Sequence, residues 1–107
     1  MNQGDVYWYT FKEPDKKRPI LILTRDAAIP FLTSITVASI TTHIRSIPSE
    51  VMLDETDGML TECAVTLDAI NTVSKRKLGA FITHLTIERM REVREVIQYV
   101  FGFDALD

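Results

Sequence analysis

A run of three basic side chains stands immediately before an apolar segment of this sequence. The run is Lys16-Lys17-Arg18, and Pro19 separates it from the apolar residues 20–23. Proline fixes its own φ and pushes the preceding residue towards extended geometry, so Arg18 is expected at the mouth of a strand. A guanidinium at that place is well positioned to bind an anion through paired N–H donors.

A second apolar segment, residues 35–40, is followed by hydroxyl groups and an imidazole. These belong to Thr41, Thr42 and His43, and Arg45 follows two positions later. If the two apolar segments form neighbouring strands, their polar ends make one site on a rigid apolar floor. His43 is also a candidate general base, because the unperturbed pKa of histidine lies near neutrality. The alternative is that His43 is a surface residue without a role.

Familiar metal and phosphate motifs are missing from the sequence. It has no glycine-rich phosphate loop, and His43 and His84 lack the spacing of a helical zinc pair. The single cysteine, Cys63, excludes an internal disulfide and a multi-cysteine metal site. Three carboxylates that could meet in space remain as an alternative metal site: Asp26, Asp54 and Asp68. We otherwise expect no metal site and no cofactor.

The composition is that of one globular domain spanning residues 1–107. Hydrophobic residues make up 46% of the chain and charged residues 25%, and no apolar run reaches the roughly 20 residues of a membrane span. The polar start, residues 1–5, does not resemble a signal peptide, so a cytoplasmic location is expected. The net charge is −3, yet basic residues gather in the first half and at residues 75–77. This pattern allows a locally basic face, although solvated surface clusters are the alternative.

Short β-type segments dominate the chain until its last quarter. Strands are expected at residues 5–10, 18–23, 35–40, 50–53, 63–67 with a bent continuation at 70–73, and 78–82. Residues 24–34 are expected to form a loop with one short helical turn. Residues 20–23 are apolar at every position, which indicates a strand that is covered on both faces.

One convincing helix is expected after Thr86, which is a suitable N-cap residue. Apolar residues recur at spacings of three and four: Met90, Val93, Ile97, Val100 and Phe101. Gly102 is well placed to end the helix in a left-handed conformation. Many short strands and one terminal helix predict a small, strongly bent sheet or partly open barrel with the helix packed against it.

The ordered motifs of this chain resemble those of the MazF/PemK family, the ribonuclease half of bacterial type II toxin–antitoxin pairs. The matching pieces are residues 4–8 (GDVYW), 17–23 (KRPILIL), 37–41 (VASIT), 63–65 (CAV, where the family usually has DSV), 68–73 (DAINTV) and 85–90 (LTIERM). They extend over nearly the whole chain, from Asn2 to about Phe101.

The resemblance implies a mainly β fold with α: a small SH3-like, partly open β-barrel with a C-terminal helix. It also implies a homodimer that cleaves single-stranded RNA such as mRNA, without a metal ion, to leave 2′,3′-cyclic phosphate and 5′-hydroxyl ends. By correspondence with the family motifs, the expected catalytic residues are Arg18 and Thr41. The expected substrate-binding residues are Lys16, Lys17, Thr42, His43 and Arg45. A cognate antitoxin with an acidic, partly disordered segment is the expected protein partner.

The chain departs from the family pattern after Asp68, where many relatives have Gln-Ile-Arg. Ala69 and Asn71 remove an amide and a guanidinium from this region. Two further functions therefore stay open: a non-catalytic protein-binding toxin, as in gyrase inhibitors with the same barrel, and an inactive relative that acts as a binding module. Retention of Arg18 and Thr41 favours the ribonuclease.

Four aromatic residues near the start could stack on an unpaired base: Tyr7, Trp8, Tyr9 and Phe11. Tyr7 and Trp8 are nevertheless expected in the core or in an interface. The sequence therefore predicts the basic and hydroxyl part of a site, but it does not select an aromatic contact.

Overall fold

The computed structural model describes residues 1–11 and 17–106, so the expected hairpin loop, including Lys16, lies outside the described residues. The strands are β1 (Asp5–Thr10), β2 (Lys17–Ile22), β3 (Ser34–Thr41), β4 (Glu50–Leu53), β5 (Cys63–Ser74) and β6 (Leu78–His84). The α-helix is α1 (Ile87–Val100), and four short 3-10 turns are η1 (Ile29–Phe31), η2 (Glu55–Asp57), η3 (Lys75–Lys77) and η4 (Phe103–Ala105).

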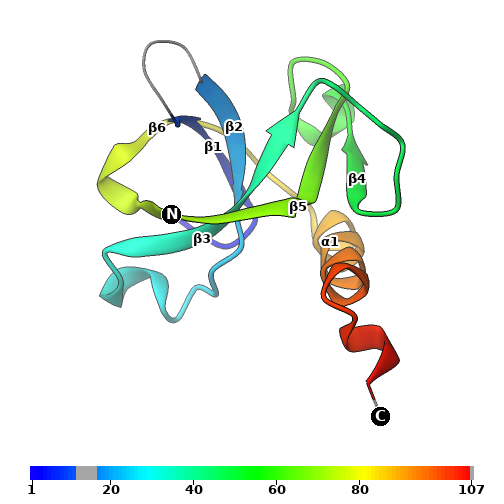
Figure 1. Cartoon of the computed structure of the whole chain (residues 1–107). Helices are drawn as coiled ribbons and strands as arrows, with labels where there is room; N and C mark the ends of the chain where they lie inside the picture. Colours follow the sequence, from blue (N-terminus) through cyan, green and yellow to red (C-terminus); the bar gives the residue numbers. More distant parts are fainter. Residues whose placement is uncertain (12–16, 107) are drawn as a thin grey trace.

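The strands form one antiparallel sheet in the order β4-β5-β3-β2-β1-β6. The sheet bends strongly on itself, and its two edge strands, β4 and β6, do not pair with each other in the part of the chain that is described. Helix α1 packs beside the β4–β5 end and leads the C-terminus away from the sheet (Figure 1). The prediction of a small, partly open barrel with a C-terminal helix is confirmed.

Strand β2 is covered on both faces, as its apolar sequence predicts. Leu21 belongs to a cluster that also contains Ala38 of β3 and Val93 of α1. Ile20 and Ile22 face the opposite way into a second cluster. All three β2 residues have no exposed surface, so this half of the strand is a rigid support.

The expected bend in the fifth strand is present and has a clear geometric cause. Ala38 of β3 lies opposite Ile70, whereas the next residue, Ser39, lies opposite Thr66, so residues 67–69 have no partner on β3. The extra residues bend β5, which lets its first half pair with β4 as well as with β3.

Helix α1 begins and ends near the predicted residues. Thr86 Oγ1 accepts a hydrogen bond from the backbone N–H of Arg89 at 3.2 Å, and Gly102 has a φ of 73°. Val93 is buried, but Phe101 lies beyond the last helical residue, is exposed, and stacks on Phe103 with ring centroids 5.6 Å apart. Phe101 therefore extends the apolar repeat in sequence without joining the core.

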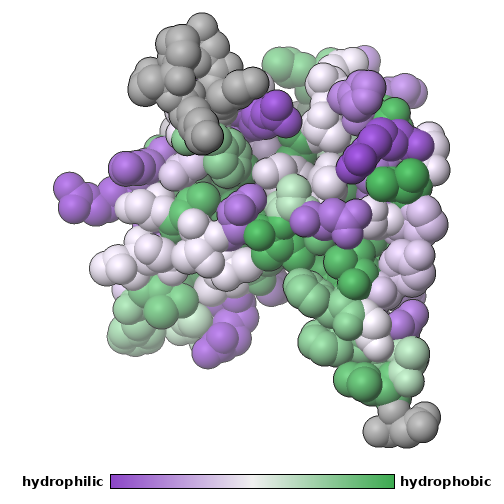
Figure 2. All heavy atoms as spheres, viewed as in Figure 1, coloured by the Kyte–Doolittle hydropathy of each residue, from purple (hydrophilic) through white to green (hydrophobic). Residues whose placement is uncertain are grey.

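Apolar surface runs over α1 and the residues that follow it, whereas hydrophilic residues gather at the upper part of the molecule in Figure 2. Within residues 1–11 and 17–106, no helix is both long enough and apolar enough to cross a membrane.

Candidate active site

A groove of about 490 Å³ opens where β2 and β3 separate. The two strands pair from Ile20 opposite Ser39 to Ile22 opposite Val37, and the same register continued outward sets Arg18 opposite Thr41. The described pairing stops before that point, because the start of β2 and the end of β3 diverge (Figure 1). The polar ends of both strands therefore face a shared opening instead of a closed ladder.

Five of the predicted site residues line this groove together. They are Lys17, Arg18, Thr41, Thr42 and His43. Their polar groups surround an apolar floor to which Pro19 and Ile40 contribute. The polar ends of the two strands therefore lie together at one groove, as the sequence analysis expected of neighbouring strands.

Arg18 is exposed, and no described carboxylate forms an ion pair with it. The same holds for Lys17 within the described residues. A guanidinium that is not held by a carboxylate of residues 1–11 or 17–106 can offer its planar set of donors to a ligand. Because Ile20 to Ile22 are fully buried, they give a rigid support to the strand that carries the exposed Arg18 side chain.

Thr41 ends β3 in a tight turn that orients its hydroxyl group. The backbone N–H of His43 donates to Thr41 Oγ1 at 3.0 Å. A hydroxyl has one donor hydrogen and two acceptor positions, so this bond uses an acceptor position and leaves the hydrogen for a ligand. The contact comes from the backbone of His43, which is also one of the residues that line the groove.

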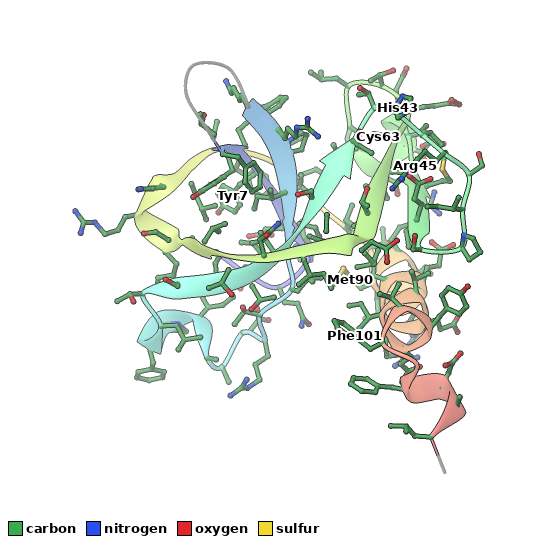
Figure 3. The ribbon with its side chains drawn as sticks, in the orientation of Figure 1. Tyr7, His43, Arg45, Cys63, Met90 and Phe101 are labelled. Carbon is green, nitrogen blue, oxygen red and sulfur yellow. The ribbon has the colours of Figure 1, made fainter. Side chains whose placement is uncertain are left out.

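Arg45 is not among the groove residues. Its Nε lies 4.0 Å from Oε2 of Glu50, and its backbone N–H donates to Glu50 Oε1 at 3.1 Å. The buried Glu50 carboxylate also accepts from the backbone N–H of Ser46 at 2.9 Å. Glu50 therefore holds the β3–β4 connection in place, and Arg45 lies on that connection beyond His43 (Figure 3).

The sequence did not identify the segment that forms the far wall of the groove. Met59, Leu60 and Thr61 line it, after a turn at Gly58 with a φ of 90°. A side chain at Gly58 would bring a Cβ to 2.3 Å from Thr83 Oγ1, so glycine is required there. The Asp57-Gly58 turn signal could have located the segment, but not the surface that it faces.

Trp8, Cys63 and Ile82 also line the groove. Trp8 is half-buried, so the expectation that it lies in the core or an interface did not anticipate its position beside Arg18. Burial raises the pKa of the Cys63 thiol to about 11, and Asp57 and Asp54 act in the same direction. A buried thiol that stays protonated at neutral pH is part of the floor and is a poor nucleophile.

No group of three or more His, Cys, Asp or Glu side chains among the described residues is arranged to hold a metal ion. The three aspartates considered as an alternative do not form such a group. Asp26 accepts from the backbone N–H of Gln3, and Asp54 accepts from Thr56. His84 lies 2.7 Å from Asp5 between Nδ1 and Oδ1, and neither residue lines the groove.

The arrangement is suited to an anion with several oxygens. Arg18 offers a planar pair of donors, Lys17 a second cation, and Thr41 a hydroxyl group of fixed direction. The apolar floor lowers the local dielectric constant, which strengthens each of these interactions. Donors in this arrangement can stabilise negative charge that builds up on a phosphate during a reaction.

Comparison with known proteins supports this interpretation. Residues 2–101 match the family described as the PemK-like, MazF-like toxin of type II toxin–antitoxin systems. Endoribonuclease MazF3 of Mycobacterium tuberculosis is 38% identical over 90 residues, which cover 84% of this chain and 87% of that protein. Endoribonuclease EndoA of Bacillus subtilis is 31% identical over 106 residues, covering 92% of this chain and 91% of that protein.

A solved structure agrees with the sequence relatives. The Mycobacterium tuberculosis toxin MazF-mt6 superposes with a TM-score of 0.83 at 34% identity, and the match covers 92% of this chain and 96% of that chain. The family match extends over nearly the whole chain and includes every described residue of the groove. This chain therefore belongs to the PemK-like, MazF-like toxin family of type II toxin–antitoxin systems.

Proposed function

We propose that this chain is the toxin of a type II toxin–antitoxin pair and acts as a metal-independent endoribonuclease on single-stranded RNA such as mRNA. The observation that carries the proposal is that Arg18, which forms no ion pair with the described carboxylates, and the hydrogen-bonded Thr41 line one groove. Membership of the family and the endoribonuclease relatives support the same activity.

In this mechanism a ribose 2′-oxygen attacks the adjacent phosphorus. The P–O5′ bond breaks, which leaves a 2′,3′-cyclic phosphate on one fragment and a 5′-hydroxyl on the other. Arg18 stabilises the charge that accumulates on the non-bridging oxygens of the phosphorane, more strongly than it binds the substrate. The Thr41 hydroxyl donates to one of these oxygens and orients the phosphate.

Two protons must move in this reaction. One leaves the attacking 2′-hydroxyl, and one reaches the departing 5′-oxygen. Arg18 is a poor base because its pKa is too high for easy loss of a proton. His43 lines the groove, and an imidazole is the side chain that enzymes most often use as a general acid or base, so it is the residue to test for these transfers.

The substrate-binding role is assigned to Lys17, Thr42 and His43 beside the catalytic pair. Lys16 and Arg45 belong to the same proposal as contacts to more distant phosphates of the strand. Arg45 supports this role because its side chain is 54% exposed despite the nearby Glu50. The lysine at position 16 stands next to Lys17 in the sequence.

The same proposal includes the partners and the location of the protein. A cognate antitoxin with an acidic segment would cover the basic groove and exclude RNA, and two copies of the chain would form a cytoplasmic homodimer. Sedimentation equilibrium tests the second point, with twice the chain mass of 12.2 kDa expected. A monomer at all concentrations would contradict the homodimer without affecting the cleavage mechanism.

The decisive experiment incubates the purified protein with a long unstructured RNA in EDTA and maps the 5′ ends of the fragments. We expect discrete cuts with 5′-hydroxyl ends, and no cut where a single 2′-deoxy nucleotide replaces the ribose that attacks. Cleavage at the deoxy position would exclude attack by the 2′-oxygen. Intact RNA under all metal-free conditions would contradict the proposed function and favour a protein-binding toxin or an inactive binding module.

A further inference from the structure

Trp8 is the single tryptophan of the chain, and it stands on β1 at an irregularity of the sheet. Tyr7 lies opposite Phe81 and Tyr9 opposite Leu78, so Gly79 and Ala80 on β6 face Trp8 alone. An extra residue of this kind forms a β-bulge, which bends the strand and redirects nearby side chains. Here the side chain at the bulge lines the groove that also contains Arg18.

Close packing against β6 fixes the backbone of Trp8. A Cβ added at Gly79 would lie 3.1 Å from the carbonyl oxygen of Trp8 and 3.3 Å from its Cβ. Such contacts are tighter than ordinary packing, so glycine permits the close approach of the two strands. The indole is therefore carried on a rigid backbone, which keeps a contact surface in a constant place.

Lys17 covers one face of the indole. Trp8 lies directly opposite Pro19 in the β1–β2 register, which makes Lys17 its diagonal neighbour on the same face of the hairpin. The Lys17 Nζ lies 5.0 Å from the centre of the Trp8 ring, within the range of a cation–π contact. No described carboxylate competes for this ammonium group.

We propose that the indole face of Trp8 is a stacking subsite for one unpaired nucleobase, and that Lys17 leaves this face for a backbone phosphate when the base arrives. The inference rests on the proposed function, since it assumes that the groove binds single-stranded nucleic acid. It adds an aromatic contact to the polar residues already assigned. Every base has a π face, so the subsite raises affinity and does not by itself select a sequence.

The relative strengths of the two contacts favour this exchange. An exposed cation–π pair is weak, whereas a base stacked on an aromatic side chain contributes more. The released Lys17 gains a phosphate partner in place of a ring, so its charge is not left unpaired. Arg18 lies next to Lys17 in the sequence and lines the same groove, so the phosphate-binding residues and the indole belong to one surface.

The single tryptophan makes the first test direct. Fluorescence of the full chain is titrated with a six-nucleotide oligodeoxyadenylate, which has no 2′-hydroxyl and cannot be cleaved, and with an abasic oligonucleotide of the same length. We expect saturable quenching by the first only, and binding of the abasic strand weaker by about 5- to 100-fold, measured by anisotropy of a labelled strand. Equal quenching and equal affinity for both strands would overturn the stacking subsite.

The movement of Lys17 has its own signature in salt dependence. Each phosphate neutralised on a single strand contributes about −0.7 to the slope of log K against log salt concentration. Lys17→Met is expected to make this slope shallower by about 0.7. Arg94→Met, which removes one positive charge from a second groove on α1, is the matched control and should leave the slope unchanged. An unchanged slope in Lys17→Met would show that Lys17 does not move to a phosphate.

Kinetics separate this inference from the proposed function. Trp8→Leu should raise KM for RNA by about 5- to 100-fold with a much smaller change in kcat, and Trp8→Phe should restore most of the affinity. Cleavage by the wild type with an unchanged KM in Trp8→Leu would contradict the subsite and leave the ribonuclease assignment intact. Quenching by the oligodeoxyadenylate without any RNA cleavage would support the subsite and contradict the ribonuclease.

Discussion

The two halves of β2 differ in almost every physical property although they belong to one strand. Residues 20–22 have no exposed surface, all pair with β3, and pack into two core clusters, and Ile20 and Leu21 pair with β1 as well. Lys17 and Arg18 are exposed, pair with β1 only, and line a groove. The buried half supplies rigidity, and the open half supplies donors that form no ion pair with the described carboxylates.

If the proposed mechanism holds, this difference explains how a small domain can position the groups that act on the phosphate. Donors that stabilise a transition state need fixed positions, because reorganisation during the reaction would cost part of the stabilisation. Residues 20–22 fix the direction of the strand, and the divergence of β2 from β3 frees Arg18 and Thr41 from the ladder. Substitutions in the two halves should therefore affect different measured quantities.

Arg18→Ala should produce the largest effect and test the open half. Removing a donor of this kind lowers the rate by about 10²–10³, while an exposed position changes the free energy of unfolding by no more than about 0.5 kcal/mol. Single-turnover cleavage and urea denaturation measure the two quantities. Arg76→Ala, which removes an exposed arginine on η3 outside the groove, is the matched control and should retain activity. Normal cleavage by Arg18→Ala would remove this residue from the mechanism.

Leu21→Ala should give the reverse result in the buried half. Truncation of a fully buried leucine leaves a cavity and lowers the free energy of unfolding by about 2–5 kcal/mol. Urea denaturation measures this loss, and cleavage at low temperature should stay near the wild-type rate per folded molecule. A loss of rate in the folded protein as large as that of Arg18→Ala would contradict the division of β2 into a support and a site.

Thr41→Val tests whether the hydroxyl at the end of β3 acts on the substrate. Valine keeps the β-branched shape but loses the donor, so we expect kcat to fall by about 10²-fold, the low end for loss of one such donor, with little change in stability. Thr41→Ser keeps the hydroxyl and should retain most of the activity. Equal rates for the valine and serine variants would restrict Thr41 to a packing role.

Cys63 lies in the closed floor and should affect stability at high pH instead of catalysis. The pKa of its thiol is raised from 9.0 to about 11, so between these values the folded state keeps a proton that the unfolded state has lost. The free energy of unfolding should therefore fall as the pH rises from 9 to 11, by on the order of 2 kcal/mol from this thiol.

Cys63→Ala isolates that contribution, because Tyr7 acts in the same direction. Burial and the nearby Asp5 raise the pKa of Tyr7, and this loss remains in the variant. Urea denaturation across the pH range should give a shallower decline for Cys63→Ala than for the wild type. Parallel curves for the two proteins would show that the thiol ionises at the same pH in both states.

His43→Ala should have the smallest effect of these substitutions. It tests whether the groups that act on the phosphate include the His43 side chain. The bond to Thr41 Oγ1 comes from the backbone N–H of residue 43, so it survives the substitution. We expect the cleavage rate to change by less than about tenfold, which is below the roughly 10²–10⁴-fold contribution of a general acid or base, and we expect the pH–rate profile to be preserved. Loss of a limb of that profile would instead assign a proton transfer to the imidazole.

Much of the fold could be predicted because local patterns and tertiary contacts agree. The uniformly apolar residues 20–23 predicted burial on both faces, and Thr86 and Gly102 marked the helix ends within one or two residues. Phe101 was placed with the helical repeat but stacks outside the core on Phe103. Periodicity could not detect this, because it does not report where the last turn meets the sheet.

The site could be predicted only in part, for a similar reason. Strand-end position identified Lys17, Arg18, Thr41, Thr42 and His43. This criterion did not distinguish those five residues from Arg45. Arg45 contacts the Glu50 carboxylate on β4 and does not line the groove. Residues 59–61 and Trp8 were not assigned to the site, since a turn signal and a strand pattern do not state which surface a side chain reaches.

The amino-acid sequence by itself determined the strand segments, the helix and the presence of basic residues at the start of a strand, because these depend on short-range periodicity and on the geometry of proline. Only the tertiary structure decided that the start of β2 diverges from the end of β3, and that Trp8, opposite the bulge, lines the same groove. Both features arise from register between distant segments, which local propensities do not encode.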